Sequence, residues 1–357
     1  MRDNRRIGGC DDFPTCITAG DPESRREPGD PTPATAVGRE ASLLALTYGA
    51  GNSIYFVRSL DGGKTMSKPV LVSNTGKISL GMHRGPRIAL THDAIVISAV
   101  WGAKGGGADG DLLAWRSKDG GRTWSSPSRV NDVQASAREG LHSMVSDGAG
   151  LIFATWLDLR GKGTRLYGAV SRDEGATWSE NRLVYESPSG SICQCCHPTA
   201  MLAGGKIYVM FRNELGGARD LYLVRSDDLG ESFRQAEKLG SGTWMLNACP
   251  MDGGSLAMLE NGVPASIWRR DGTVFLSGVM GKEQLLGPGK NPVLAVSSSG
   301  IYAAWSAGKS LMLLEPGKTV PAVMDDDGAF PYLLKMPGGE VVAAWEQQGA
   351  IVVRILR

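Results

Sequence analysis

Ser117-Lys118-Asp119-Gly120-Gly121-Arg122-Thr123-Trp124 decides the fold of this chain, because variants of these eight residues occur four times. The copies begin at Ser59, Ser117, Ser171 and Ser226, so that successive copies lie 58, 54 and 55 residues apart. A fixed period of this size is typical of an array of similar supersecondary units. Such an array favours one large closed domain over two average domains in a chain of 357 residues.

The composition favours an all-β protein. The chain has 49 glycines and 9 tryptophans among 42% hydrophobic and 21% charged residues, and glycine-rich turns between short apolar runs are typical of such proteins. The net charge of +1 gives no indication of a nucleic-acid or acidic membrane surface. No apolar run reaches the roughly 18 residues that a spanning helix needs. The polar start of the chain shows no signal peptide, so either the protein is cytosolic or an export segment is missing.

A short strand that ends on an aromatic residue occurs seven times after residue 30. These strands cover residues 43–48, 95–101, 151–156, 207–211, 264–268, 301–305 and 341–345. A further strand follows each of them, and in the first four repeats it leads into the eight-residue stretch. Period-2 alternation with β-branched and aromatic residues supports strands rather than helices. Each unit is therefore expected to be a four-stranded blade.

Stacked blades form a β-propeller. We predict a single propeller domain over residues 31–357, with seven blades preferred and six as the alternative, because the fifth and sixth units are short. The last unit has only three strands before Arg357. Residues 1–30 are otherwise irregular but contain a candidate strand near residues 13–19. We therefore expect this N-terminal segment to supply the outer strand that closes the ring.

The repeated eight-residue stretch is expected to be structural. An Asp in a tight turn accepts hydrogen bonds from backbone N–H groups, a glycine supplies a positive φ angle, and the final aromatic residue packs against the blade. The aspartates of the four copies are therefore not expected to be catalytic. They are Asp61, Asp119, Asp173 and Asp228.

The four copies of S-x-D-x-G-x-[TS]-[WFM] resemble the Asp-box repeats of the sialidase superfamily. The resemblance implies a β-propeller that binds or hydrolyses glycans, as an exo-glycosidase of sialidase type, with the boxes on the rim opposite the site. It also implies three arginines that hold a substrate carboxylate, a Tyr–Glu nucleophile pair and an Asp acid/base. The family's Arg-Ile-Pro sequence does not precede the first box here, and its nearest counterpart is Pro86-Arg87-Ile88.

Candidates for these roles lie near the ends of the inner strands. They are Arg84, Arg87, Arg138, Glu139, Arg212 and Tyr332. Tyr332 begins the last blade, where the resemblance places the nucleophile. No acid/base stands out among Asp11, Asp12 and Asp30. Solvated or packing residues are the alternative interpretation of every candidate.

Cysteines and histidines form a second group of candidates. His142 and His197 each lie fourteen residues before the closing aromatic of their blade, and Cys249 continues the series in the next blade. Because the starts of the innermost strands line the central channel of a propeller, thiolates and imidazoles there could ligate copper or zinc. The complete set is His83, His142, Cys193, Cys195, Cys196, His197 and Cys249.

Disulfides are the alternative to a metal site. Cys195 or Cys196 would pair with Cys249 of the neighbouring blade, and Cys10 with Cys16. Free buried thiols are a third interpretation. The C-x-C-C sequence followed by N-x-C-P also resembles a group of secreted bacterial Asp-box proteins, which implies an extracellular or periplasmic location.

The sequence is therefore compatible with three functions. The first is an exported, sialidase-like propeller that binds or hydrolyses glycans and requires no cofactor. The second is a metal-binding propeller with copper or zinc at the channel mouth, and the third is a non-catalytic interaction scaffold. The expected partner is a glycan or another small molecule at the channel mouth. We expect no nucleic acid, no membrane span and a monomeric protein.

Overall fold

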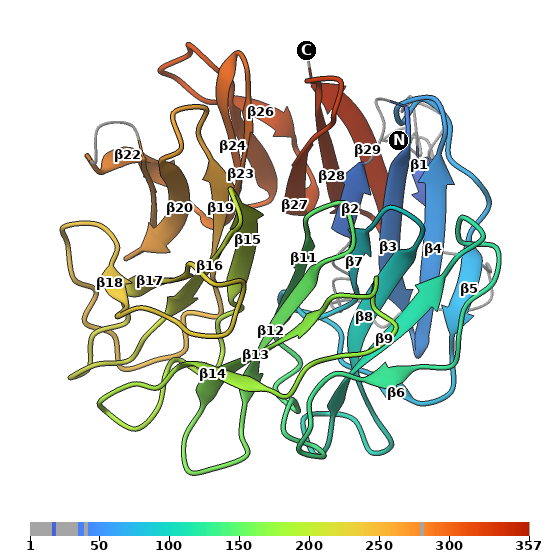
Figure 1. Ribbon diagram of the computed structural model, residues 1–357. Helices are drawn as coiled ribbons and strands as arrows, with labels where there is room; N and C mark the ends of the chain where they lie inside the picture. The colour runs from blue at the N-terminus through green and yellow to red at the C-terminus, as the bar shows by residue number, and fades with distance from the viewer. Residues whose placement is uncertain (1–15, 19–34, 39–41, 279–281, 357) are drawn as a thin grey trace, which may run out of the picture.

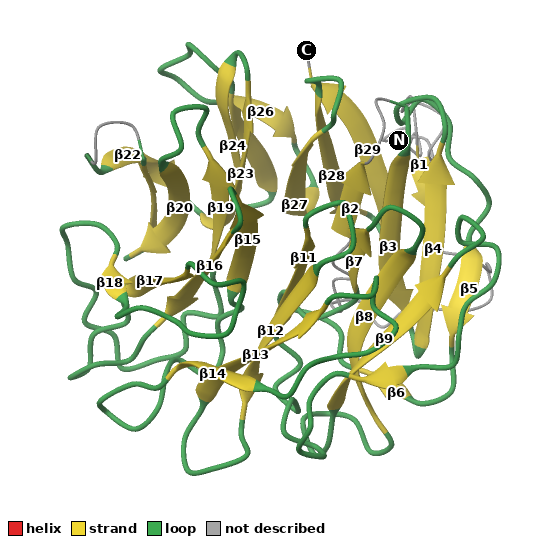
Figure 2. Ribbon diagram, in the orientation of Figure 1, coloured by secondary structure: helices red, strands yellow, loops and turns green. Residues whose placement is uncertain are grey.

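The computed structural model describes residues 16–18, 35–38, 42–278 and 282–356. These residues form strands and no helix, and the strands make seven sheets arranged as a ring (Figures 1 and 2). The predicted seven-bladed β-propeller is confirmed, and the six-blade alternative is excluded. No described segment is a helix long and apolar enough to cross a membrane.

Each blade runs from the central channel outward in chain order. The first blade consists of β2 (Thr35–Gly38), β3 (Leu44–Ala50), β4 (Ser53–Ser59) and β5 (Val70–Ser73). The second consists of β6 (Lys77–Ile78), β7 (Arg87–Leu90), β8 (Ile95–Gly102), β9 (Asp111–Ser117) and β10 (Ser128–Arg129). The third consists of β11 (His142–Ser146), β12 (Ile152–Asp158), β13 (Arg165–Ser171) and β14 (Arg182–Tyr185), and the fourth of β15 (Thr199–Ala203), β16 (Lys206–Arg212), β17 (Leu221–Ser226) and β18 (Glu237–Lys238). The first described strand of each blade, or β7 in the second, contacts its counterparts in the adjacent blades, so that these strands surround the channel.

The last three blades complete the ring. They consist of β19 (Gly254–Met258), β20 (Pro264–Arg270), β21 (Thr273–Ser277) and β22 (Gln284–Pro288); β23 (Lys290–Ser297), β24 (Gly300–Ala307), β25 (Ser310–Leu314) and β26 (Ala322–Asp325); and β27 (Gly328–Lys335), β28 (Val341–Gln347) and β29 (Ala350–Leu356) with β1 (Cys16–Thr18). In the last blade Cys16 pairs with Val352 and Thr18 with Ala350. The outermost strand of the seventh blade therefore comes from the N-terminal segment, beside β29 in Figure 1.

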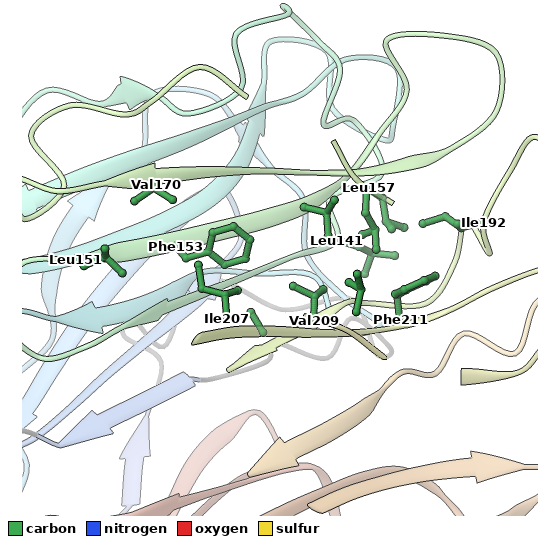
Figure 3. Packing of buried hydrophobic residues seen from close by; sticks show 13 residues of the cluster. Leu141, Leu151, Phe153, Leu157, Val170, Ile192, Ile207, Val209 and Phe211 are labelled. Atoms are coloured by element: carbon green, nitrogen blue, oxygen red, sulfur yellow. The ribbon is translucent and has the colours of Figure 1, made fainter. Parts of the chain in front are cut away.

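The aromatic residue of each second strand packs against the preceding blade. Trp156 of the third blade lies in a cluster with Val100 of the second, and Phe211 of the fourth lies with Phe153 of the third (Figure 3). The same arrangement continues around the ring with Tyr48, Trp101, Trp268, Trp305 and Trp345. An aromatic side chain buries roughly 150–250 Å² of surface. The seven aromatic residues that mark the repeat in the sequence are thus the contacts that join the blades.

The eight-residue stretch forms the same hydrogen-bonded turn in each of its four blades. Asp119 accepts hydrogen bonds from the backbone N–H groups of Arg122 (2.9 Å) and Thr123 (3.0 Å) and from Thr123 Oγ1 (2.6 Å). Ser117 Oγ accepts the N–H of Gly121 at 2.8 Å. These bonds, those from Thr123 above all, lower the pKa of Asp119. The matching carboxylates of the other turns are Asp61, Asp173 and Asp228.

Close packing leaves no room for a side chain at the fifth residue in three of the four turns, at Gly121, Gly175 and Gly230. Gly121 has a φ of 88°, and a Cβ built on it would lie 2.1 Å from Cε1 of Phe56 in the preceding blade. The fourth position of the turn also has a positive φ, yet Glu174 (61°) and Leu229 (56°) occupy it in two copies. The fourth position therefore tolerates a side chain, whereas a side chain at Gly121 would overlap the preceding blade.

The antiparallel register separates the two rims of the propeller. Ser226, at the end of β17, pairs with Ile207 near the start of β16, and Met210 near the end of β16 pairs with Thr199 at the start of β15. The starts of the innermost strands therefore lie at the opposite ends of the blades from the repeated turns. A site at these strand starts lies away from the turns.

Candidate functional site

A cavity of about 220 Å³ lies in the channel at the starts of the innermost strands. It is lined by residues of the second to seventh blades, carried by β7, β11, β15, β19, β23 and β27 or by the residues just before them. Its polar lining residues are His83, Arg87, Ser143, His197, Thr199, Ser255 and Tyr332. Pockets for drug-sized ligands start at roughly 300 Å³, so this cavity suits a smaller group such as one unit of a chain that continues into solvent.

His83 lies where the inner edge of the second blade is interrupted between β6 and β7. Its Nε2 is 2.9 Å from Oδ1 of Asn291, at the start of the sixth blade. Its ring stacks on that of His197, with centroids 4.3 Å apart, and meets the edge of Phe330 at 5.6 Å. Burial lowers the pKa of His83, although the charge of Asp252 opposes this shift. His83 is therefore a neutral imidazole at neutral pH.

Left-handed backbone conformations gather around His83. His83 has a φ of 69°, its partner Asn291 of 55° and its ring contact Phe330 of 51°, and they come from the starts of three different blades. Such conformations cost non-glycine residues about 1–2 kcal/mol each. Strained residues tend to cluster at functional sites, where the surrounding structure holds them. This observation marks the channel mouth as the candidate site.

Arg87 is a half-buried cation that faces the cavity. It donates hydrogen bonds to the backbone carbonyl groups of His83 (2.6 Å), Gly85 (3.3 Å) and Pro86 (3.1 Å). No carboxylate among the described residues forms an ion pair with it. Burial lowers the pKa of Arg87 to about 10, and Tyr332 opposes this shift. The cavity thus contains one positive charge that the described part of the protein does not neutralise.

Tyr332 lines the same cavity from the seventh blade. Burial raises the pKa of its hydroxyl, and the charge of Arg87 opposes this shift. The phenol therefore carries its proton at neutral pH. A neutral imidazole, a protonated phenol and a guanidinium then face one space, which is the arrangement that acid–base chemistry on an anionic ligand needs.

Asp252 lies behind the histidines and is 1% exposed. Its Oδ2 lies 3.3 Å from Nε of Arg269 and accepts the backbone N–H of Asn291 at 3.2 Å. Asp252 therefore links the fifth blade to the residue that hydrogen-bonds His83. Its ion pair with Arg269 offsets the cost of burying the carboxylate.

The predicted arginines do not converge on the cavity. Arg212 is 1% exposed and donates to the carbonyl groups of Arg219 (2.5 Å), Arg269 (3.0 Å) and Asp252 (3.4 Å). Arg84 donates to the carbonyl of Glu139 at 2.7 Å, and Arg138 is exposed. Of the arginines predicted from sequence, Arg87 alone lines the cavity. Asp11, Asp12 and Asp30 lie outside the described residues.

The predicted thiol and imidazole ligands form separate groups. The Sγ atom of Cys193 lies 3.6 Å from that of Cys195 and 3.5 Å from that of Cys196. Hydrogen bonds from these two thiols lower the pKa of Cys193, whereas the pKa values of Cys195 and Cys196 are raised. Cys249 is an exposed free thiol outside this group, so the expected disulfide to Cys249 is not formed. Cys10 and the side chain of Cys16 lie outside the described residues.

His142 is separate from both groups. It is fully buried, and its Nε2 lies 3.0 Å from Ser98 Oγ of the second blade. Of the predicted histidine ligands, only His83 and His197 line the cavity.

Asp252, Arg269, Asn291 and Phe330 were not among the predicted site residues. One of them carried a usable signal. The count of fourteen residues back from the closing aromatic, which aligns His142 with His197, also leads from Trp305 to Asn291. The places of Asp252, Arg269 and Phe330 in the site depend on how the blades converge, which the spacing of residues along the sequence does not reveal.

Comparison with known proteins agrees with this architecture. Residues 94–339 match the family model described as BNR repeat-like domain. The chain belongs to the BNR repeat-like domain family. The predicted resemblance to the sialidase superfamily is thereby confirmed. No curated protein matches the chain.

Solved structures share the fold of this BNR-repeat propeller at low sequence identity. The α-L-arabinanase of Penicillium chrysogenum, complexed with arabinobiose, is 14% identical over 96% of this chain and 97% of that chain, with a TM-score of 0.56. Polysaccharide lyase Uly1 is 11% identical over 96% and 94%, with a TM-score of 0.60. The Hadza microbial sialidase Hz136 is 16% identical over 91% and 66%, with a TM-score of 0.52. These similarities show a common fold.

Proposed function

We propose that the cavity at the channel mouth binds an acidic unit of a glycan and that Arg87 pairs with its carboxylate. The observation that carries this proposal is the half-buried guanidinium of Arg87, which lines the cavity and which no described carboxylate neutralises. A planar guanidinium fork binds a carboxylate through charge-assisted hydrogen bonds. A carboxylate on the ligand would supply the missing counter-charge inside the cavity.

The described surroundings also favour a sugar as the carrier of that carboxylate. Ser143, Thr199 and Ser255 line the cavity together with apolar residues such as Phe330 and Leu256, and mixed polar and apolar contacts suit the hydroxyl groups and ring faces of a sugar. Three propellers of the same fold are named for glycan ligands or glycan reactions. Export belongs to this proposal, because polysaccharides of this kind lie outside the cell.

Hydrolysis of sialidase type is one reaction that such a site could perform, with Tyr332 as the nucleophile. Glycoside hydrolysis usually needs two carboxyl groups about the scissile bond, or a carboxylate beside a tyrosine nucleophile. The described residues that line the cavity include neither Asp nor Glu. The lining therefore supports binding of an acidic sugar better than it supports hydrolysis.

Elimination is the second candidate reaction, and the lining favours it. Arg87 would hold the carboxylate of a uronic acid, and the neutral His83 would take the proton from the carbon next to it. As the carbon–carbon double bond forms, the glycosidic carbon–oxygen bond breaks. Tyr332, whose phenol is protonated, would give its proton to the leaving oxygen. These pKa shifts keep the imidazole unprotonated and the phenol protonated at neutral pH, which are the forms that this exchange needs.

The test is binding and turnover of acidic and neutral polysaccharides by the wild-type protein and by Arg87→Met. We expect the wild type to prefer acidic chains and Arg87→Met to lose that preference, while Arg138→Met, which removes an exposed charge, binds as the wild type does. Ultraviolet absorbance of the new double bond detects elimination. Release of the fluorophore from a fluorogenic sialoside detects sialidase-type hydrolysis. Equal binding of acidic and neutral chains by the wild type would refute the proposal.

A further inference from the structure

The C-x-C-C turn lies behind the channel mouth, between β14 and β15. The Sγ atoms of its three thiols, Cys193, Cys195 and Cys196, all lie within 4.8 Å of one another. A disulfide joins two sulfurs at about 2.05 Å and would leave the third without a role. Three sulfurs at one point are instead the donor set of a thiolate metal site.

The separations fit a bound ion. Tetrahedral zinc with Zn–S bonds near 2.3 Å holds its sulfur ligands about 3.8 Å apart. Cys193 Sγ lies 3.6 Å from Cys195 Sγ and 3.5 Å from Cys196 Sγ. The third separation, between Cys195 Sγ and Cys196 Sγ, is at most 4.8 Å, so shifts of the thiols by no more than about 1 Å would admit an ion. Side-chain rotation alone can supply a movement of this size.

The surroundings support the sulfurs and give access to them. The N–H of Asp252 donates to Cys196 Sγ at 3.4 Å, and the N–H of Cys193 donates to the carbonyl of Arg212 at 3.2 Å. Hydrogen bonds of this kind orient metal ligands. Cys193 and Cys196 are buried, but Cys195 is half-buried and Gln194 is exposed, so an ion can reach the cluster from one side.

We propose that Cys193, Cys195 and Cys196 together bind one thiophilic d¹⁰ cation, Zn²⁺ or Cu⁺, through three sulfurs. The site differs from the predicted one, because neither the histidines of the channel nor Cys249 belongs to it. It is independent of glycan binding. The hydrogen bond from Asp252 connects it to the channel mouth, because Asp252 also holds the N–H of Asn291, the partner of His83.

The test titrates reduced protein with Zn²⁺ and, under anaerobic conditions, with Cu⁺, each against a chromophoric chelator. A background with Cys10→Ser and Cys16→Ser removes the two cysteines outside the described side chains. We expect one ion per chain, and a loss of affinity in Cys193→Ser and Cys196→Ser of at least the roughly 10–100-fold seen for changes around metal ligands. Cys249→Ser is the matched control and should bind as the background protein does.

X-ray absorption of the loaded protein keeps the proposal testable if a serine variant fails to fold. We expect about three sulfur neighbours at about 2.3 Å. An ion bound by nitrogen and oxygen alone would overturn the proposal. So would reduced protein that binds neither ion, or equal loss of binding in the Cys249→Ser control.

Discussion

The imidazole rings of His83 and His197 stack with centroids 4.3 Å apart and planes inclined by 24°, although they come from the second and fourth blades. Two charged rings at this distance would repel one another. Burial lowers the pKa of both histidines, and for His197 the charges of His83 and Arg87 add to the shift. The pair is therefore neutral in the folded protein. Its neutrality leaves Arg87 as the main charge that a ligand meets in the cavity.

The neutral histidines predict loss of stability in mild acid. His83, His142 and His197 all have folded pKa values below the ordinary value of 6.5. Between the folded and unfolded pKa values the unfolded chain binds more protons, so stability is complete above about pH 6.5 and falls as the pH drops below it. We expect a slope of up to about 1.4 kcal/mol per pH unit for each histidine, measured by urea unfolding.

Two variants isolate this contribution. His142→Gln should flatten the dependence of unfolding free energy on pH, because His142 is fully buried. His92→Gln should leave it unchanged, because that side chain is 81% exposed. The aspartates of the repeated turns do not interfere, because their pKa values are lowered from 3.8 and their contribution is lost only at more acidic pH. Stability that does not change between about pH 8 and pH 5 would contradict the neutral histidines.

We expect Arg212 to stabilise the folded protein and not to contact the ligand. Arg212→Met leaves three carbonyl groups without their donor. At about 1 kcal/mol or more for each unsatisfied group, we expect a loss of about 3 kcal/mol or more in unfolding free energy. Arg138→Met should change it little, because Arg138 is exposed. A variant Arg212→Met of unchanged stability that loses glycan binding would instead place Arg212 in the site.

The fold could be predicted because its main contacts repeat in the sequence. The closing aromatics, such as Trp156 and Phe211, recur at the spacing of one blade and join neighbouring blades. Alternation along the strands fixes which side chains face a neighbouring blade. Strand ends were less well predicted. The second strands continue one or two residues past their aromatic residues, because the ladder extends until the chain turns.

The site could be predicted only in part, because it depends on directions that spacing does not contain. Arg87, His83 and Tyr332 stand at the strand starts that line the channel, and they were predicted from that position. Arg212 follows the closing aromatic of its blade, but Trp244 from the loop after β18 lies over its guanidinium at 5.3 Å. No local pattern predicts that a distant loop covers an arginine. The same holds for Asp252, which is buried by neighbouring blades.

Gly121→Ala should destabilise the propeller more than a glycine substitution at an open site. Its φ of 88° and the 2.1 Å approach of a built Cβ to Phe56 Cε1 combine backbone strain with overlap. We expect a loss of about 2–5 kcal/mol in unfolding free energy. Gly106→Ala is the control, since Gly106 has a φ of 60° but no atom within 4 Å of a built Cβ. Equal losses in the two variants would show that the blade contact contributes nothing.

The pairing of β1 with β29 predicts that the N-terminal strand holds the ring closed. Ile17 pairs with Ile351 in the last blade. Ile17→Pro therefore removes a backbone donor and forces a fixed φ within an edge strand of only three residues. We expect a lower melting temperature and faster proteolysis in the last blade, because the blade would lose its outer strand. Faster amide hydrogen exchange in β29, the strand that pairs with β1, would measure the loss of this pairing directly.

Val323→Pro is a suitable control for ring closure, because Val323 is an exposed residue of the outer strand β26 and closes no ring. Val323 pairs with Met312 within the sixth blade. Disruption of β26 therefore affects one edge of a blade whose four strands follow one another in sequence. In the seventh blade the outer strand β1 is distant in sequence from β29, so its loss removes the pairing that closes the ring. We therefore expect Ile17→Pro to lower the melting temperature more than Val323→Pro. The reverse order would mean that interblade packing alone closes the ring.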